Sequence, residues 1–594
     1  MQPIDRRGRA VAIISTGIVS AVVGGVLHAV LLAVWALSGH FTWVSRDYVW
    51  MSPLAAALVL VPGSVTLAAL VALWRGRGGV AAATGVMSTV LAFGLLLPLS
   101  EVSRAAALVL ATGLGVAVAR LVFPWEERWV RSTPRAAALS VLCLGVLAGA
   151  QDGWRRWRES RALGTLAPAP PGAPNVLLVV LDAARARDVG FVTPAAATTP
   201  RLDRRAVDGA VFTNAFSVGP WTLPSHASML SGRYASELAA DWTVPVERSH
   251  PVLPELLRAR GYATGAFVAN LHYTAWDSGL LRGFAHVDDY PRNAAMVVRS
   301  TPFTQTKLAD TLLRGVTGAS LRALAHPDLS MVRQHRYQSR LGGEVIDAFL
   351  AWRVQQSRPW FAMVNLMDPH LVTTADTATR RRYPHDDRGL TDYRAAIQYL
   401  DGELDRLLQR LADDGTLDST LVIVTADHGE LLGEHGLHGH AQSLYRDVAH
   451  VPLLIRFPRA VPPAVVSRPV SLRDLAATVL DLTGVESNAL PGHSLRAAWD
   501  GSGAKLSAPY ASARQQPNPL GQYPTASGDL SAVFDAEWSY IRNHGTGGEE
   551  LFAVEASGGE SADLVADARY ADRLAVMRAA VDSMRRVLQP APRR

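Results

Sequence analysis

The sequence predicts an α/β fold, a mostly parallel sheet covered by helices on both faces, preceded by an all-α transmembrane domain. Three observations support this prediction. Residues 1–150 are almost entirely apolar, a proline-rich segment follows, and from Asn175 onward short β-branched runs alternate with helical stretches. Strands that alternate with helices form βαβ units, which build parallel sheets. At 594 residues the chain is also too long for one compact domain.

The N-terminal part contains apolar stretches at roughly 11–37, 51–74, 79–99, 105–123 and 136–151. Most are long enough to cross about 30 Å of hydrocarbon as a helix, and the last is the shortest. A cleavable signal peptide would explain only the first stretch. Buried core helices would not follow one another with almost no charges. We therefore predict a membrane domain over 1–151 with about five transmembrane helices.

Arginines indicate the orientation of these helices, because cytoplasmic loops carry an excess of basic residues. Arginines precede the first stretch and lie between the second and third and between the fourth and fifth: Arg6, Arg7, Arg9, Arg75, Arg77, Arg128, Arg131 and Arg135. Five crossings then place the large C-terminal part outside the cytoplasm, at the cell membrane; one crossing more or fewer would invert this topology. Four arginines after the last stretch depart from the rule, and we expect them along lipid headgroups: Arg155, Arg156, Arg158 and Arg161.

Composition excludes several other classes of protein. The formal net charge of +6 comes largely from arginines near the membrane stretches and the C-terminus, without the basic stripe of a nucleic-acid-binding protein. Cys143 is the only cysteine, which excludes intrachain disulfides and thiolate metal sites. Residues 152–174 are the predicted linker, and its prolines, from Pro168 to Pro174, make that part a semi-rigid spacer.

The C-terminal half shows alternating strand and helix patterns. Strands are predicted at 176–181, 262–268, 360–366, 421–425 and 452–456, and helices at 252–260, 342–355, 391–412 and 472–484. Parallel sheets of this kind carry their sites at the carboxyl ends of the strands. The segment 295–335 has no clear strand. Its amphipathic run 306–314 fits a lid, a membrane-surface contact or, most simply, a peripheral helix.

Polar side chains follow these predicted strands. Asp182 ends the first strand, Asp427 and His428 end the fourth, and Thr222 lies at a turn that leads into a helix. Two carboxylates, an imidazole and a hydroxyl suit a divalent metal ion with an activated nucleophile. Ordinary alternatives exist, since Asp182 and Thr222 are also residue types that cap helices. Ser225 is the rival hydroxyl, although a role in stabilising the turn suits it better.

Ordered motifs from Asn175 to the C-terminal helix resemble those of the sulfatase family of the alkaline phosphatase superfamily. Besides the strand ending at Asp182 and the turn Gly219–Ser228, they are Thr199–Asp203, Leu230–Tyr234, Leu256–Tyr262, Asp368–His370, Thr425–Glu430, Gly433–Gly436 with His440, Val451–Leu454, Val470–Leu475, Leu490–Leu495 and Glu550–Phe552. The resemblance implies an alkaline phosphatase-like fold. It implies a catalytic domain over 175–500 and a small C-terminal subdomain over 501–594 that completes it.

Departures from the family pattern bear on the chemistry. The family's signature opens with a cysteine or serine that is oxidised to formylglycine, whereas the same frame here opens with Thr222, whose oxidation would give a ketone. The last position of the signature is an arginine in the family and His226 here. The family's Lys-x-His motif corresponds to the region near Asn270–His272, where the lysine is absent. These changes resemble the membrane-bound phosphotransferases of the superfamily, such as lipoteichoic acid synthase and the phosphoethanolamine transferases. Those enzymes use a metal-bound threonine.

The resemblance and the residues together predict one divalent ion on Asp182, Thr222, Asp427 and His428. Oxygen ligands with one nitrogen suit manganese, magnesium or zinc, and calcium less well. The ion would lower the pKa of the Thr222 hydroxyl, which attacks the ester in line.

Two further histidines have predicted catalytic roles. His370 and His440 are expected to stabilise charge or to protonate the leaving group, with a structural role as the alternative for each. His226 and His272 are weaker candidates. Arg185 either orients Asp182 or faces solvent.

The predicted protein is a membrane-anchored, metal-dependent enzyme with its site outside the cytoplasm. It cleaves or transfers a phosphate or sulfate ester group through a metal-bound threonine nucleophile. Its expected partners are the lipid bilayer and a phosphate or sulfate ester, with lipid-linked and glycan-linked esters as candidates, and no nucleic acid. Two alternatives stand beside it: a sulfatase or phosphodiesterase without an acceptor, and a catalytically inactive, membrane-tethered binding protein.

Overall fold

A computed structural model describes residues 5–73, 78–97, 102–240, 242, 244–300, 340–370, 390–516, 521–554 and 559–588. The chain forms two compact units. One contains Met1–Arg161 with Tyr290–Ser330, and the other contains Ala162–Asp289 with Met331–Arg594. The helix predicted over 306–314 lies outside the described residues.

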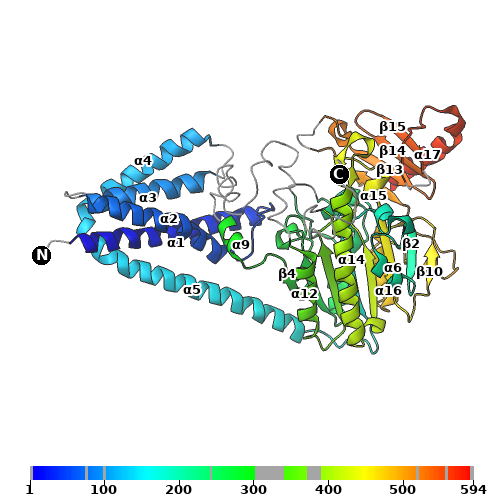
Figure 1. Cartoon of the computed structure of the whole chain (residues 1–594), viewed down its shortest axis with the longest axis horizontal. Coiled ribbons are helices and arrows are strands. Elements are labelled where there is room, and N and C mark those ends of the chain that lie inside the picture. Colours follow the sequence, from blue (N-terminus) through cyan, green and yellow to red (C-terminus); the bar gives the residue numbers. More distant parts are fainter. Residues whose placement is uncertain are drawn as a thin grey trace. The chain divides into compact units, whose positions relative to one another are not determined.

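The first unit is helical. Four helical segments are long and apolar enough to cross a membrane, namely α1 (Arg6–Leu37), α2 (Tyr48–Ala72), α3 (Gly79–Leu96) and the segment Arg104–Gly164. The last segment contains α4 (Arg104–Val122) and α5 (Glu126–Gly164), joined by a 3₁₀ turn at Phe123–Trp125. Figure 1 shows α4 and α5 as separate rods that meet at this turn. Each predicted apolar stretch therefore overlaps one of these helices.

Glycines allow the helices of this unit to approach closely. A Cβ atom on Gly115 of α4 would lie 2.5 Å from the Gly85 carbonyl oxygen of α3, and one on Gly25 of α1 would lie 2.2 Å from the Pro53 backbone of α2. Small residues at such contacts are typical of membrane helices, which associate mainly by packing. Large apolar side chains of the same helices point outward, among them Leu70 and Val109.

Helix α5 extends beyond the predicted membrane domain, so residues 152–164 are helical and only residues 165–174 form an irregular spacer. The physical reason is that no proline interrupts the chain between residue 152 and Pro168. Two of the arginines that depart from the charge rule pair with Asp152, Arg155 at 3.5 Å and Arg156 at 3.0 Å. Arg292, which precedes α9 (Ala294–Arg299), also pairs with Asp152, at 3.0 Å.

The second unit is built on a nine-stranded sheet in the order β10-β2-β9-β6-β1-β5-β3-β4, with β11 paired to β2. The strands are β1 (Asn175–Leu181), β2 (Ala210–Phe216), β3 (Ala263–Val268), β4 (His286–Asp288), β5 (Trp360–Leu366), β6 (Thr420–Thr425), β9 (His450–Arg456), β10 (Ala464–Val466) and β11 (Val470–Ser471). All recorded pairings are parallel except those of β9, which is antiparallel to both β2 and β6. The predicted mostly parallel sheet is confirmed.

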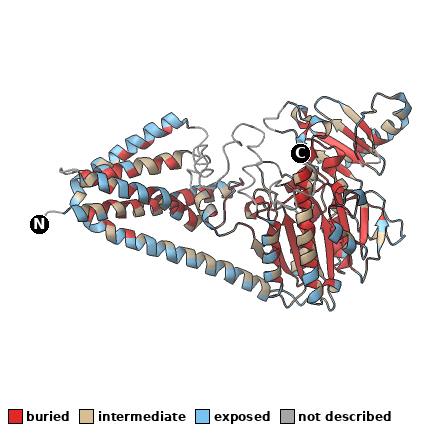
Figure 2. Cartoon of the chain, viewed as in Figure 1, coloured by how far each residue is buried: buried red, intermediate tan, exposed pale blue. Residues whose placement is uncertain are grey.

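Helices cover both faces of this sheet. On one face, α6 (Pro200–Ala206), α12 (Gly342–Arg353) and α14 (Leu390–Asp413) pack against one another, and α7 (Thr222–Ser231), α8 (Leu253–Ala259) and α16 (Leu475–Leu482) form the other group. The division follows from the right-handedness of crossover connections. The connections through α6, α12 and α14 run toward the β10 edge of the sheet, whereas the connection from β2 through α7 and α8 to β3 runs toward the β4 edge. Connections that run in opposite directions place their helices on opposite faces. Figure 2 shows the buried core between sheet and helices.

A smaller antiparallel sheet completes the second unit. It contains β12 (Tyr510–Ala513), β13 (Leu530–Phe534), β14 (Trp538–Asn543) and β15 (Glu549–Ala553), and α17 (Ala571–Leu588) packs on it. The ring of Phe534 stacks on that of Phe216, with centroids 4.8 Å apart, which joins the two sheets. The Ser512 N–H donates to the Val218 carbonyl at 3.0 Å, so β12 contacts the turn before α7.

Candidate active site

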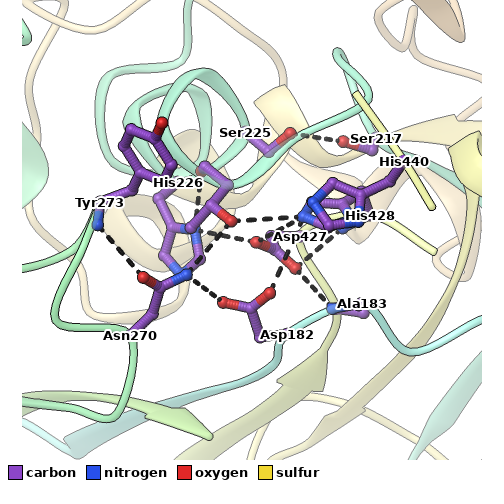
Figure 3. A network of polar contacts seen from close by, with 12 residues as sticks. Asp182, Ala183, Ser217, Ser225, His226, Asn270, Tyr273, Asp427, His428 and His440 are labelled. Atoms are coloured by element: carbon purple, nitrogen blue, oxygen red, sulfur yellow. Dashed lines mark hydrogen bonds and ion pairs between the residues drawn. The ribbon is translucent and has the colours of Figure 1, made fainter. Parts of the chain in front are cut away.

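The carboxyl ends of two neighbouring strands bring the predicted carboxylates together. Asp182 follows β1, Asp427 and His428 follow β6, and β1 and β6 are adjacent and parallel. All three side chains are fully buried. One ligand atom of each lies within 4.8 Å of the others, an arrangement that can hold a metal ion (Figure 3).

Thr222 is the first residue of α7 and directs its hydroxyl at this group. Its Oγ1 lies 3.3 Å from His428 Nε2 and 3.4 Å from Asn270 Nδ2. The rival hydroxyl, Ser225, bonds instead to Ser217 Oγ at 2.9 Å and to the Gly219 carbonyl at 3.1 Å (Figure 3). Thr222 therefore joins the carboxylate group, whereas Ser225 ties the turn that leads into the helix.

Two buried oxygens provide a test of whether an ion fits. Asp182 Oδ1 and Asp427 Oδ2 accept no hydrogen bond from any residue that the structure describes. A buried carboxylate oxygen without a donor is costly, and two such oxygens side by side repel each other. Two carboxylate oxygens, an imidazole nitrogen and a hydroxyl oxygen form a donor set that suits one divalent cation, which would relieve both penalties.

The electrostatics of the carboxylate pair are unequal. Burial, assisted by the negative charge of Asp427, raises the pKa of Asp182 to about 6. Burial also opposes ionisation of Asp427, but the neighbouring His428 and His226 outweigh it and hold the pKa of Asp427 below its ordinary range. Asp427 is therefore the carboxylate that the protein itself keeps ionised.

Backbone groups fix the orientation of these ligands. The N–H groups of Ala183 and His428 donate to Asp427 Oδ1 at 3.2 and 2.9 Å. Ala183 adopts a left-handed φ of 63°, which is uncommon without glycine and aims its N–H at Asp427. His428 Nδ1 donates to the Gly429 carbonyl at 2.8 Å, so its Nε2 faces Asp182 and Thr222 as an acceptor.

Two asparagines belong to the site although the sequence analysis gave them no role. Asn270 Nδ2 donates to Asp182 Oδ2 at 2.9 Å, and Asn365 Nδ2 lies 3.3 Å from the same oxygen. The sequence contains a feature that could have indicated each of these asparagines. Asn365 is the one polar residue in the apolar strand β5, and Asn270 lies just after the end of β3, where sites are expected.

His226 also lies in this network. Its Nδ1 is 2.9 Å from the Thr222 carbonyl and 3.4 Å from Asp427 Oδ2, and the side chain is fully buried. Burial alone would lower its pKa, but the close approach of Asp427 Oδ2 and the negative charges of both carboxylates raise it. For the other weak candidate, His272, the recorded contact with the network is its backbone N–H, which donates to Asn270 Oδ1 at 3.1 Å.

The two predicted catalytic histidines lie beside the carboxylate group. His440 stacks at a tilt against His428, with ring centroids 4.2 Å apart, and meets the edge of His370 at 4.8 Å. Its Nδ1 lies 3.0 Å from Glu430 Oε2. The structure therefore brings His370 and His440 together next to His428, with Glu430 as an additional member.

Arg185 takes neither of the roles considered for it. It is 2% exposed and forms ion pairs with Asp188 at 2.5 Å and with Glu434 at 2.8 Å. Its guanidinium also lies over the Tyr393 ring, 5.1 Å from the centroid. The recorded contacts place Arg185 in a buried polar layer behind the site. It neither faces solvent nor bonds to Asp182.

Comparison with known proteins identifies the family of the catalytic unit. The family model described as Sulfatase matches residues 174–485, more than half of the chain. The chain belongs to the sulfatase family. Among curated relatives, the chain is 27% identical to arylsulfatase K of Danio rerio over 54% of its own length and 67% of the relative's. It is 25% identical to choline-sulfatase of Rhizobium meliloti over 53% of its own length and 68% of the relative's.

Solved structures show the same fold in the catalytic unit. The phosphonate monoester hydrolase of Agrobacterium radiobacter aligns over 70% of the present chain and 96% of its own chain, with a TM-score of 0.53 and 20% identity. A protein solved in complex with D-glucosamine-2-N,6-O-disulfate aligns over 70% of the present chain and 98% of its own, with a TM-score of 0.51 and 16% identity. The protein is thus a sulfatase-like hydrolase of a family that uses a divalent metal ion. The family match begins after the four helical segments that are long and apolar enough to cross a membrane.

Proposed function

We propose that this member of the sulfatase family is a membrane-anchored, metal-dependent enzyme that cleaves or transfers a phosphate ester group with Thr222 as the nucleophile. One observation carries the proposal. The hydroxyl that stands at the formylglycine position lies 3.3 Å from His428 Nε2, beside two buried carboxylate oxygens without hydrogen-bond donors among the described residues. A threonine placed there has no aldehyde chemistry available and must act through its own oxygen.

The proposed ligands of the ion are Asp182, Thr222, Asp427 and His428. When bound, a divalent ion would lower the pKa of the hydroxyl and polarise the ester oxygen. Asn270, whose amide lies 3.4 Å from Oγ1, orients the hydroxyl. These ligands suit manganese, magnesium or zinc better than calcium.

The chemical step follows from the position of Thr222. Its Oγ1 forms a bond to phosphorus while the bond from phosphorus to the leaving oxygen breaks, and His370 or His440 supplies a proton to that oxygen. Threonine carries a single oxygen on Cβ, so no second hydroxyl on that carbon can expel the phosphoryl group. The phosphoryl group therefore leaves Thr222 only when another nucleophile attacks the phosphorus. Attack by water makes a hydrolase, and attack by an alcohol of a sugar or lipid makes a transferase.

The membrane helices narrow the substrate class. Four segments long enough to cross a bilayer precede the catalytic unit, and the arginine distribution favours a site outside the cytoplasm. We infer that the substrate is a phosphate ester linked to a lipid or a glycan of the cell envelope. Sulfate ester hydrolysis is the second candidate, because the curated relatives are named as sulfatases.

A substrate panel tests this proposal. The full-length protein in detergent would be assayed with an aryl phosphate, an aryl phosphodiester and an aryl sulfate, each with added manganese, zinc or magnesium. We expect a phosphate ester to be the fastest substrate, and Thr222→Ala to abolish its turnover. Faster turnover of the sulfate would favour the second candidate. Metal binding without turnover of any ester would favour an inactive binding protein.

A further inference from the structure

A cavity of about 280 Å³ lies between the turn before α7 and the small antiparallel sheet with its helix α17. This volume is close to the lower end for ligand pockets, about 300 Å³, so the cavity suits one ring-sized group and not a polymer chain. Trp221, which directly precedes Thr222, and Ala441, which directly follows His440, both line it. The cavity therefore begins one residue away from the candidate active site on two segments of the chain.

Aromatic rings form one wall of this cavity. Trp221 and Trp242 both line it and stack nearly parallel, with ring centroids 4.2 Å apart and planes 9° apart. The edge of the Tyr273 ring braces the pair, with centroids 5.1 Å from Trp221 and 6.1 Å from Trp242. Trp221 is buried, whereas Trp242 is half-buried. A braced indole offers a flat apolar surface on which the ring of a ligand can lie.

Two arginines also line the cavity, Arg514 exposed and Arg585 half-buried. Neither has a recorded ion pair with a carboxylate of the described residues. Arg514 Nη2 donates to the Leu238 carbonyl at 2.9 Å, and Arg585 Nη1 donates to His544 Nδ1 at 2.7 Å. A guanidinium has five N–H groups, so each arginine keeps donors for a further partner. An anion is the partner that a guanidinium binds most strongly, often through two parallel hydrogen bonds.

A chain of hydrogen bonds fixes the position of Arg585. His544 Nδ1 accepts from Arg585, which assigns the ring proton to Nε2, and Nε2 donates to Ser531 Oγ at 2.9 Å. Ser531 Oγ lies 3.0 Å from the Tyr510 hydroxyl. These side chains line the cavity together with Asp529, the one carboxylate among the described lining residues. Hydroxyl groups and a carboxylate beside an aromatic wall suit a ligand that itself carries several hydroxyl groups.

We propose that this cavity binds a negatively charged sugar, which carries the ester group that Thr222 attacks. The C–H face of the sugar ring packs on the indole of Trp242, and its carboxylate or phosphate pairs with Arg514 and Arg585. The ester of the same molecule reaches the nucleophile, because Trp221 and Thr222 are adjacent in the chain. The role in turnover rests on the proposed function, whereas the binding of the sugar does not.

Sugar binding to the full-length protein in detergent tests this inference. Galacturonate, galactose and benzoate would be titrated separately and followed by ligand-observed NMR. We expect galacturonate to bind at least about tenfold more tightly than galactose, because hydrogen bonds to a charged group account for a difference of that size. We expect benzoate to bind more weakly than galacturonate, because it lacks the hydroxyl groups. Equal affinity for galacturonate and galactose, or tighter binding of benzoate, would overturn the proposal, and this comparison needs no variant.

Variants locate the binding site. Arg514→Gln/Arg585→Gln is expected to weaken galacturonate binding at least about tenfold, and Trp242→Ala to weaken binding of both galacturonate and galactose. Arg586→Gln is the matched control, because Arg586 is exposed on the same helix as Arg585 and is not among the residues that line the cavity. Unchanged galacturonate affinity in the double arginine variant would contradict the proposal. Galactose 6-phosphate, measured as the difference between the wild type and that variant, distinguishes a phosphate from a carboxylate as the favoured charge.

Turnover separates this inference from the proposed function. Galacturonate binding that the double arginine variant loses, in a protein that turns over no phosphate ester, would refute the proposed function and leave the sugar site standing. Turnover of an aryl phosphate by a protein that does not prefer galacturonate to galactose would overturn the sugar site and leave the proposed function standing.

Discussion

At the scale of single residues, the pair Asp182 and Asp427 explains why the site is expected to need an ion. Both carboxylates are fully buried, and each has one oxygen that accepts no hydrogen bond from the described residues. Without a cation the pair is a source of repulsion, so metal binding and the ionisation of both carboxylates are linked.

Replacement of Asp427 by asparagine tests this linkage. Asp427→Asn keeps the shape of the side chain but removes the negative charge of the carboxylate that the folded protein keeps ionised. We therefore expect loss of the bound metal and about a thousandfold or greater loss of turnover. Asp401→Asn is the matched control, because Asp401 is a buried carboxylate that accepts the N–H groups of Arg201 and Leu202 away from the site. Metal content would be measured for both. Unchanged metal in Asp427→Asn would exclude Asp427 as a ligand.

The sequence identified the residues whose position depends only on local structure. Asp182 and Asp427 could be predicted because they end apolar strands, and the ends of parallel strands meet at one edge of a sheet. Asn270 and Asn365 could not be assigned roles in the same way, since an amide becomes part of a site only through the partner that it meets. The role of Arg185 could not be predicted for the same reason, because its partner Glu434 lies far away in the chain and only the fold brings the two together.

At the scale of elements, the joint between the two sheets of the catalytic unit contains a buried acid. The side chain of Glu560 is 2% exposed and lies beside the short helix α15 (Arg446–Ala449), whose Arg446 N–H donates to it at 2.9 Å. Burial raises the pKa of Glu560 to about 7. The folded protein therefore binds a proton at this residue more tightly than the unfolded chain does.

A pH dependence of stability follows. The contribution of Glu560 is fully present below the ordinary glutamate pKa of about 4.5 and is lost as pH rises through about 7. Relative to Glu560→Gln, we expect the wild type to lose up to about 3 kcal/mol of unfolding free energy between these limits. Thermal unfolding of both proteins from pH 4.5 to 8 measures the difference. A difference in Tm that stays constant with pH would contradict the account.

The elements themselves were predictable where periodicity was strong. The buried face of α14 follows the helical period of its leucines, and β1 is an unbroken apolar run. The reversed direction of β9 was not predictable, because a fully buried strand has the same apolar pattern in parallel and antiparallel pairing. Strand β2 was missed since Thr213 and Asn214 interrupt its apolar residues at the point where its register shifts.

At the scale of the whole molecule, the division into two units was only partly predictable. The apolar composition of residues 1–150 separates the helical unit, but residues 290–300 belong to that unit although they follow the catalytic unit's strand β4 in sequence. No local pattern marks this return. Its recorded contacts include the ion pairs of Arg292 with Asp47 at 2.8 Å and with Asp152 at 3.0 Å, which join residues far apart in the sequence.

Topology is the prediction that belongs to this scale. The arginine distribution predicts that a reporter active only outside the cytoplasm is active when fused after Pro174. The matched fusion after Arg131, in the loop predicted to be cytoplasmic, is expected to be inactive with that reporter and active with a cytoplasmic one. The opposite pattern at both positions would place the catalytic unit inside the cell.

The central claim is that Thr222 forms a covalent ester during turnover, and mass spectrometry of an acid-quenched reaction with an aryl phosphate tests it most directly. We expect one added phosphoryl group on the peptide that contains Thr222, its retention in Ser225→Ala and in Thr222→Ser, and its absence in Thr222→Ala, which should also lose at least about a thousandfold in turnover. A phosphoryl group on Ser225, or full turnover by Thr222→Ala, would contradict the account.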